Sequence, residues 1–148
     1  SFAAELADEL GRDQKDMLLE LIGSDRKLDP AKQGFPDEFW DYGEVYDEYP
    51  IDTMRLKNVI NLAAEKSGWG KSMPKREGLG IAAHRSFVTY VASVVHVKVD
   101  DDGTIRVPEV HMAVDCGARG RGGRRRHENL TGRAGLLCAC HVAGARTS

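Results

Sequence analysis

Residues 111–130, HMAVDCGARGRGGRRRHENL, hold the residue types in this chain that are best suited to chemistry. Asp115 offers a carboxylate, Cys116 a thiol and Gly117 a backbone without side-chain bulk, and five arginines follow within Arg119–Arg126. Arginine binds phosphate through a planar fork of donors, and glycine lets the backbone follow a nucleic-acid strand. One interpretation is therefore a small nucleic-acid-binding module, although no aromatic residue is interleaved for base stacking.

Histidines and cysteines supply three further candidate sites. His84 stands beside a cation and a hydroxyl in His84–Ser86, but a histidine on a strand is more often a packed or surface residue. His96 and His111 are expected to face each other across a hairpin, where a metal would need ligands that their spacing does not supply. The run Cys138–His141 offers soft ligands for zinc, yet the remaining Cys and His residues match no common zinc spacing.

Glycine and aspartate clusters have simpler structural interpretations. Gly78–Gly80 lacks the Lys-Ser/Thr step and the further glycines of a phosphate loop, so it is expected to allow close backbone approach at a strand. Asp100–Asp102 is acidic like a calcium loop but lacks the 12-residue ligand pattern, and is expected to form a turn. The three cysteines form no disulfide framework, which mildly favours a reducing compartment.

Helical periodicity occupies the first half of the chain. Phe2, Leu6 and Leu10 recur at helical spacing, and a second helix is expected from an Asp13 cap to Gly23. A third helix is expected from Asp52 or Thr53 to Gly68. Between the second and third helices, residues 24–51 have no clear period. Six aromatic residues within Phe35–Tyr49 favour an ordered loop pinned by its rings, or a surface that binds a ligand or partner.

The second half alternates with a period of two. From Thr89 one face carries Val91, Ser93, Val95, Val97 and Val99, and the other carries Tyr90, Ala92, Val94, His96 and Lys98. Asp100–Gly103 predicts a hairpin turn, and a return strand is expected over 104–115, with a bulge or sheet edge at Pro108. A third strand is expected over 81–88. The predicted fold class is α+β: a helical hairpin, a third helix and a long antiparallel β-hairpin.

Charge divides the 148 residues into two parts. Residues 1–117 carry 14 basic and 22 acidic residues, whereas residues 118–148 carry seven arginines and one glutamate, so the net charge changes from −8 to +6. No apolar run reaches the ~18–20 residues of a membrane span, so no membrane partner is expected. The first residues are acidic and helix-like rather than a signal peptide, and position 1 is not Met. The chain is expected to begin inside a longer protein, either cytoplasmic or periplasmic.

Several segments in order resemble the molybdopterin-binding large subunit of the xanthine dehydrogenase and aldehyde oxidase family, in its isoquinoline oxidoreductase beta-subunit type. They are AAEKSGWGK at 63–71, GLGIAAHRSF at 78–87, VDDDGTIRV at 99–107 and AVDCG at 113–117. The opening SFAAELADELGRDQKD also looks like the SFIDELAHAAGKDP helix pair of these subunits. The resemblance spans residues 1–117, and no single segment is diagnostic without the others.

The resemblance implies a fragment of a larger molybdopterin-binding domain. Such subunits hold molybdenum on a pterin cofactor of the cytosine dinucleotide type and hydroxylate aldehydes or N-heteroaromatic carbons with oxygen from water. Electrons pass to an iron–sulfur small subunit or domain, and a glutamate in a GEPG-like segment acts as base. That segment is absent here, so no catalytic residue is transferred. Asp115, Cys116 and Gly117 are expected only at the edge of a cofactor loop, and this chain alone is expected to bind no cofactor.

Residues 118–148 depart from the family's pattern. Family members continue after DCG with a segment like FAVNPDRVRAQMEGA, whereas this chain continues with ARGRGGRRRHENLTG. Arg, Gly and Ala have GC-rich codons, while Lys does not. The tail composition therefore favours a frameshift near Gly117, and otherwise a disordered Arg/Gly-rich segment. The expected organisation is a subunit fragment over 1–117 followed by an unrelated tail over 118–148.

Overall fold

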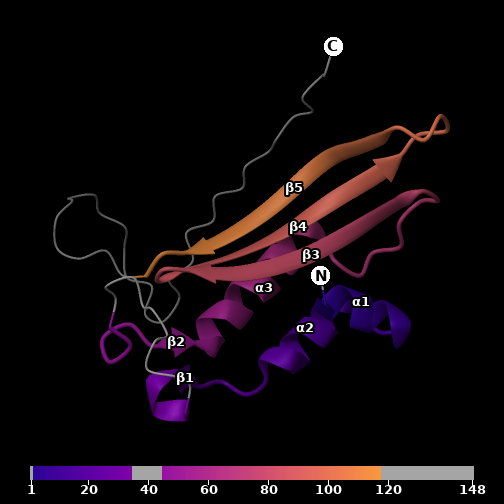
Figure 1. Ribbon diagram of the computed structural model, residues 1–148. Helices are drawn as coiled ribbons and strands as arrows, with labels where there is room; N and C mark the ends of the chain where they lie inside the picture. The colour runs from indigo at the N-terminus through magenta and orange to yellow at the C-terminus, as the bar shows by residue number, and fades with distance from the viewer. Residues whose placement is uncertain (1, 35–44, 118–148) are drawn as a thin grey trace, which may run out of the picture.

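The computed structural model describes residues 2–34 and 45–117, which form an α+β unit of three α-helices and a three-stranded antiparallel sheet (Figure 1). The helices are α1 (Phe2–Glu9), α2 (Gln14–Ile22) and α3 (Thr53–Ser67). The sheet contains β3 (Glu77–Ser86), β4 (Thr89–Val99) and β5 (Ile105–Asp115), and a smaller antiparallel pair joins β1 (Lys27–Leu28) to β2 (Ile51–Asp52). A short 3-10 helix, η1, covers Ala31–Gln33. No helix within these two ranges has the length and apolarity to cross a membrane.

Two hairpins build the sheet in the order β3-β4-β5. The predicted turn between β4 and β5 is confirmed: the Gly103 N–H donates to Asp100 O at 3.0 Å, and Gly103 has φ 86°. The expected third strand is also present, but it begins at Glu77 and ends at Ser86 because Phe87 adopts a positive φ of 51° in the tight β3–β4 turn. The expectation for Pro108 is confirmed, since β5 is an edge strand and its register with β4 shifts between His96 and Lys98.

Local capping explains the helix boundaries. The Asp13 carboxylate accepts from the Asp16 N–H at 3.0 Å and begins α2, as predicted, and Gly23 ends that helix. The Asp52 carboxylate accepts from the N–H groups of Met54 and Arg55 and begins α3, which ends at a left-handed Gly68 with φ 71°. These side chains satisfy donors that a helix N-terminus leaves unpaired.

The first helix is present, but its apolar spacing does not mark a buried face. Phe2 is 74% exposed and Leu10 57% exposed, whereas the small Ala7 is fully buried. Helix α1 packs mainly on α2, and a small side chain such as that of Ala7 allows close contact between two short helices. The predicted helical hairpin is thus confirmed. The buried residue of α1 is Ala7, however, and not Phe2 or Leu10, which the apolar spacing had indicated.

Hydrogen bonds hold the two ends of the predicted loop over 24–51 together. Strand β1 pairs with β2, with Lys27 opposite Asp52 and Leu28 opposite Ile51. The buried Thr53 hydroxyl accepts from the Arg26 N–H at 2.8 Å and lies 2.9 Å from Ser24 O, to which it donates. This short sheet was not foreseen. The aromatic residues at positions 35–42 lie outside the described residues.

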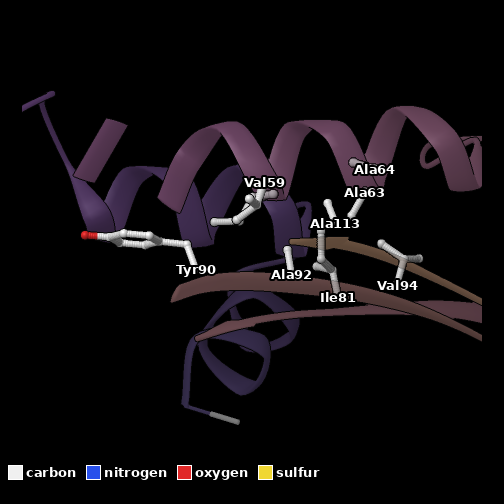
Figure 2. Packing of buried hydrophobic residues seen from close by; sticks show 9 residues of the cluster. Val59, Ala63, Ala64, Ile81, Tyr90, Ala92, Val94 and Ala113 are labelled. Atoms are coloured by element: carbon white, nitrogen blue, oxygen red, sulfur yellow. The ribbon is translucent and has the colours of Figure 1, made fainter. Parts of the chain in front are cut away.

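The core lies between α3 and one face of the sheet (Figure 2). Helix α3 contributes Val59, Ile60, Ala63 and Ala64, and the sheet contributes Ile81, Tyr90, Ala92, Val94 and Ala113. The small side chains of Ala92 and Ala113 leave room for the helix to approach the strands closely. The covered face is therefore the one that carries Tyr90, Ala92 and Val94.

The opposite face of the sheet is not covered by a helix within the described residues, because the helices lie on the side of Tyr90 (Figure 1). Paired residues share a face, so the register assigns three small residues of β3, four valines and a serine of β4, and three apolar residues of β5 to what we call the open face. These are Gly78, Gly80, Ala82, Val91, Ser93, Val95, Val97, Val99, Val110, Met112 and Val114, and the same face also carries Ile105 opposite Val99, His84 opposite Val91, and the pair Ser86–Thr89. None of these residues is an aspartate, glutamate, lysine or arginine.

Candidate functional site

The three sequence-predicted site residues are Asp115, Cys116 and Gly117. Asp115 is the last residue of β5, and the other two follow it directly. Asp115 is 5% exposed and pairs in the sheet with Tyr90, so its side chain is on the covered face. There it meets Arg55 from the first turn of α3, which donates from Nε to Oδ2 and from Nη2 to Oδ1, both at 2.8 Å. This two-bond arrangement is the strong and directional form of a guanidinium–carboxylate pair.

Asp115 remains ionised in this environment. Burial is the largest influence on its pKa and acts to raise it, but hydrogen bonds from Arg55 and from the Gly117 N–H together outweigh burial and hold the pKa below its ordinary value. The hydrogen bond to Asp115 likewise raises the pKa of Arg55, and burial only partly offsets it. The pair is thus fully charged at neutral pH.

Gly117 closes a turn on the same carboxylate. Its N–H donates to Asp115 Oδ1 at 2.9 Å, and its φ of 79° is in the left-handed region that favours glycine. A Cβ at this position would lie 3.4 Å from Arg55 Nη2. Cys116, which lies between Asp115 and Gly117 in the chain, is exposed and its thiol is free. These contacts fix the direction in which the chain leaves β5.

Tyr90 joins this ion pair to the start of α3. Its ring is fully buried, Arg55 lies 4.5 Å from the ring centroid, and Arg85 lies 5.8 Å from it. The Tyr90 hydroxyl accepts from the Asp52 N–H at 2.7 Å. Figure 2 shows the hydroxyl pointing away from the other core side chains, at the end of the cluster. Sheet, helix cap and ion pair therefore meet at one point.

The Asp115 carboxylate, at the expected edge of a cofactor loop, makes its hydrogen bonds within the chain. Three donors from the chain itself already engage the Asp115 carboxylate. Across residues 2–34 and 45–117, no group of three or more His, Cys, Asp or Glu side chains is placed to hold a metal. Asp115 and Gly117 position a turn, and we derive no reaction step from them.

The structure separates the members of the His84–Ser86 candidate. Along β3 the side chains of His84 and Arg85 point to opposite faces, and His84 is exposed. Arg85 belongs instead to the Tyr90 side of the sheet, where it faces Tyr90 in the register. His84 and Ser86 share the opposite face, and among the described residues no hydrogen bond joins their side chains.

The expectation that His96 and His111 face each other is wrong, because the register pairs His96 with Glu109 and His111 with Val94. Each histidine instead contacts a glutamate: His96 Nε2 lies 2.9 Å from a Glu77 oxygen, and His111 Nε2 lies 3.0 Å from a Glu109 oxygen. The register shift near Pro108 places His96 opposite Glu109 instead of Pro108, one residue nearer to His111, but it does not bring the two histidines opposite each other.

The aspartate cluster forms the expected turn, but the expectation of close backbone approach at Gly78–Gly80 is wrong. Gly78–Gly80 lies inside β3, and among the described residues no neighbouring atom comes within 4 Å of where a Cβ at Gly78 or Gly80 would be. In the β4–β5 turn, Asp100 pairs with Arg106, Asp101 pairs with Arg76, and Asp102 accepts from the Thr104 N–H at 2.9 Å. The segments Arg119–Arg126 and Cys138–His141 lie outside the described residues.

Sequence reasoning missed Arg55 as a member of a site, and it placed Arg85 only in the His84–Ser86 candidate. The signals that exist are an arginine in the first turn of a helix that is otherwise apolar toward the sheet, and a tyrosine at the start of a face of small residues. Neither shows which carboxylate lies nearby. Comparison with known proteins adds nothing: no family model, curated protein or solved structure matches this chain.

Proposed function

We propose that residues 1–117 are a scaffold part of a molybdenum hydroxylase large subunit of the isoquinoline oxidoreductase type. The observation that carries the proposal is the set of resembling segments in family order. They fall on connected elements: the end of α3, strand β3, the β4–β5 turn and the end of β5. One packed unit thus contains all four segments, which supports a common origin over a chance match of separate short strings.

The open face gives independent support. Antiparallel sheets that face water on one side usually alternate apolar and polar residues. Here β4 carries Val91, Val95 and Val97 on its uncovered side, and no charged residue stands among them on that face. A contiguous apolar surface of this kind is typical of a contact with further protein. In the proposed subunit, that protein is the remainder of the cofactor-binding domain.

The role of this chain in the proposed subunit is to position, not to catalyse. The Arg55–Asp115 pair and the hydrogen bond from the Gly117 N–H hold the turn at the end of β5. The hydroxylation of an aldehyde or N-heteroaromatic substrate, the molybdenum cofactor of the cytosine dinucleotide type and the iron–sulfur partner belong to the whole enzyme under this proposal. The isolated chain is expected to carry neither cofactor nor activity.

The coding DNA tests the proposal directly. If a frameshift follows Gly117, one of the two alternative frames encodes a FAVNP-like continuation in place of the Arg/Gly-rich tail. Absence of that segment from both frames removes the frameshift. The purified chain should also contain far less than one molybdenum per chain by elemental analysis, and stoichiometric molybdenum with pterin contradicts the scaffold role.

Two neighbouring valines test the open face. Val95→Lys places a charge on the open face and should reduce self-association in light scattering while leaving the thermal midpoint nearly unchanged. Val94→Lys is its matched control, since Val94 is fully buried on the covered face and a lysine there should unfold the chain. If Val95→Lys is as destabilising as Val94→Lys, the face is already covered and this support is lost.

A further inference from the structure

A pocket of about 220 Å³ lies beside the ion pair, between the β1–β2 pair and the start of β4. Its polar walls include Lys27, Glu48, Asp52, Arg55, Arg85 and Tyr90. The volume corresponds to roughly seven water molecules at ~30 Å³ each. A ligand that fills the pocket is therefore small.

Two of its cations lack an acidic partner within the described part of the chain. Arg55 is held by Asp115, but neither Lys27 nor Arg85 has a carboxylate partner among these residues. Arg85 donates one long hydrogen bond of 3.3 Å, from Nη2 to Tyr49 O, and its buried Nε has no hydrogen-bond partner. One N–H donor of this guanidinium, at Nε, is thus buried without an acceptor at the pocket wall.

Tyr90 adds a third donor. Its hydroxyl is used as an acceptor by the Asp52 N–H, so its own proton has no acceptor among the described residues. The residue is fully buried and lines the pocket. A buried hydroxyl proton without an acceptor is costly, and a ligand oxygen within hydrogen-bond distance would satisfy it.

The two carboxylates in the wall limit the charge of the ligand. Asp52 is committed to the N-cap of α3, while Glu48 stands in the wall with no cation partner among the described residues. The charges of Lys27 and Arg85 are matched by those of Glu48 and Asp52, so the wall is close to neutral and does not suit a multiply charged anion. A single carboxylate would be held by direct contacts with the two cations.

From these observations we propose that the pocket binds the carboxylate of a small organic acid, with Lys27, Arg85 and the Tyr90 hydroxyl as its donors. The carboxylate supplies acceptor oxygens where the chain has donors without acceptors, and its single charge suits the mixed wall. This inference does not depend on the proposed scaffold function.

Acetate is the probe that tests it. Isotope-labelled full-length chain is titrated with sodium acetate at neutral pH, with sodium chloride at equal ionic strength as reference, and amide and arginine Nε–H resonances are followed. Saturable shifts confined to Asp52, Arg85 and Tyr90 with acetate, and not with chloride, are expected. Equal, unsaturable shifts with both salts overturn the proposal.

Variants assign the donors. Arg85→Met should weaken acetate binding by about tenfold or more, as expected for loss of a charge-assisted hydrogen bond. If Arg85→Met fails to fold, the exposed Lys27→Met serves instead. Arg106→Met, in the distant β4–β5 turn, is the matched control and should leave binding unchanged. Undiminished binding by the folded Arg85 or Lys27 variant overturns the assignment, as does phosphate dianion binding tighter than acetate at mildly alkaline pH.

Discussion

Replacement of Asp115 by asparagine tests the contact on which the candidate site depends. Asp115→Asn keeps the size of the side chain but removes the charge that neutralises Arg55, which lies in a part-buried position beneath the Tyr90 ring. The Gly117 N–H retains an oxygen acceptor in the variant. The expected loss of stability therefore comes mainly from an arginine left without its counter-charge.

The size of the expected loss in unfolding free energy depends on how far the side chains of Asp115 and Arg55 are buried. Removing one partner of a fully buried ion pair costs about 3–5 kcal/mol, whereas an exposed pair contributes about 0–1 kcal/mol. The Asp115 side chain is 6% exposed and that of Arg55 is 26% exposed. An intermediate loss of about 2–3 kcal/mol in the free energy of unfolding is expected for Asp115→Asn. A double-mutant cycle with Arg55→Met should show a coupling energy of about 1–2 kcal/mol.

The contribution of Asp115 should also depend on pH. Its pKa is lower in the folded chain than the ordinary value of about 3.9, so the unfolded chain binds more protons as the pH falls through this range. The stabilisation is fully present above about pH 4 and is lost on further acidification. The difference in stability between the wild-type chain and Asp115→Asn should therefore narrow at low pH.

Urea denaturation followed by circular dichroism measures both effects. Glu20→Gln is the control: it removes a carboxylate from the exposed Arg12–Glu20 pair and should leave the urea midpoint unchanged. A midpoint for Asp115→Asn equal to that of Glu20→Gln refutes the ion-pair argument. A stability difference that stays constant on acidification refutes the pKa argument separately.

Four substitutions extend the test with the same urea assay. Tyr90→Phe should lower the free energy of unfolding by about 1–2 kcal/mol because the Asp52 N–H loses its acceptor. Asp52→Ala should cost about 1–2 kcal/mol through loss of the α3 cap, and no loss would show that the cap is dispensable. Gly117→Ala should cost about 1–2 kcal/mol because of its positive φ. Ala92→Leu should cost about 1–3 kcal/mol by overpacking beneath α3, and an unchanged midpoint would mean that the helix packs loosely.

Much of the fold follows from local signals in the sequence. Asp13, Asp52 and Gly68 mark helix ends through contacts with residues one to four positions away, so a short window of sequence contains the information. The β4–β5 hairpin is local in the same sense, because Asp100–Gly103 sets the turn. The structure confirms each of these predictions.

The site is different, because its partners are distant in the chain. Arg55 and Asp115 are sixty positions apart, and they meet only after α3 has packed on the sheet and β5 has closed the second hairpin. The strand register decides in the same way that His96 lies opposite Glu109 and not His111. Residue spacing carries no direct information on either contact.

Hydrophobicity alone does not decide which face of the sheet α3 covers. On β4 the valine face is the more apolar one, yet α3 packs on Tyr90, Ala92 and Val94. Small side chains at Ala92 and Ala113 let the helix axis come close to the strands, and the Tyr90 hydroxyl reaches the helix cap. Shape and hydrogen bonding therefore select this face for the helix.

That selection leaves β4 apolar on both sides. Continuous apolar strands are typical of sheets covered on both faces, whereas a sheet with one wet face normally alternates. The run from Tyr90 to Val97 is closer to the first pattern, interrupted only by Ser93 and His96, while the described residues cover only the Tyr90 side. Since burial of the valines would stabilise the sheet by about 25 cal/mol for each Å² of apolar surface, a second layer over the open face is favoured on physical grounds. The scaffold proposal supplies that layer, and the response to Val95→Lys decides whether it is needed.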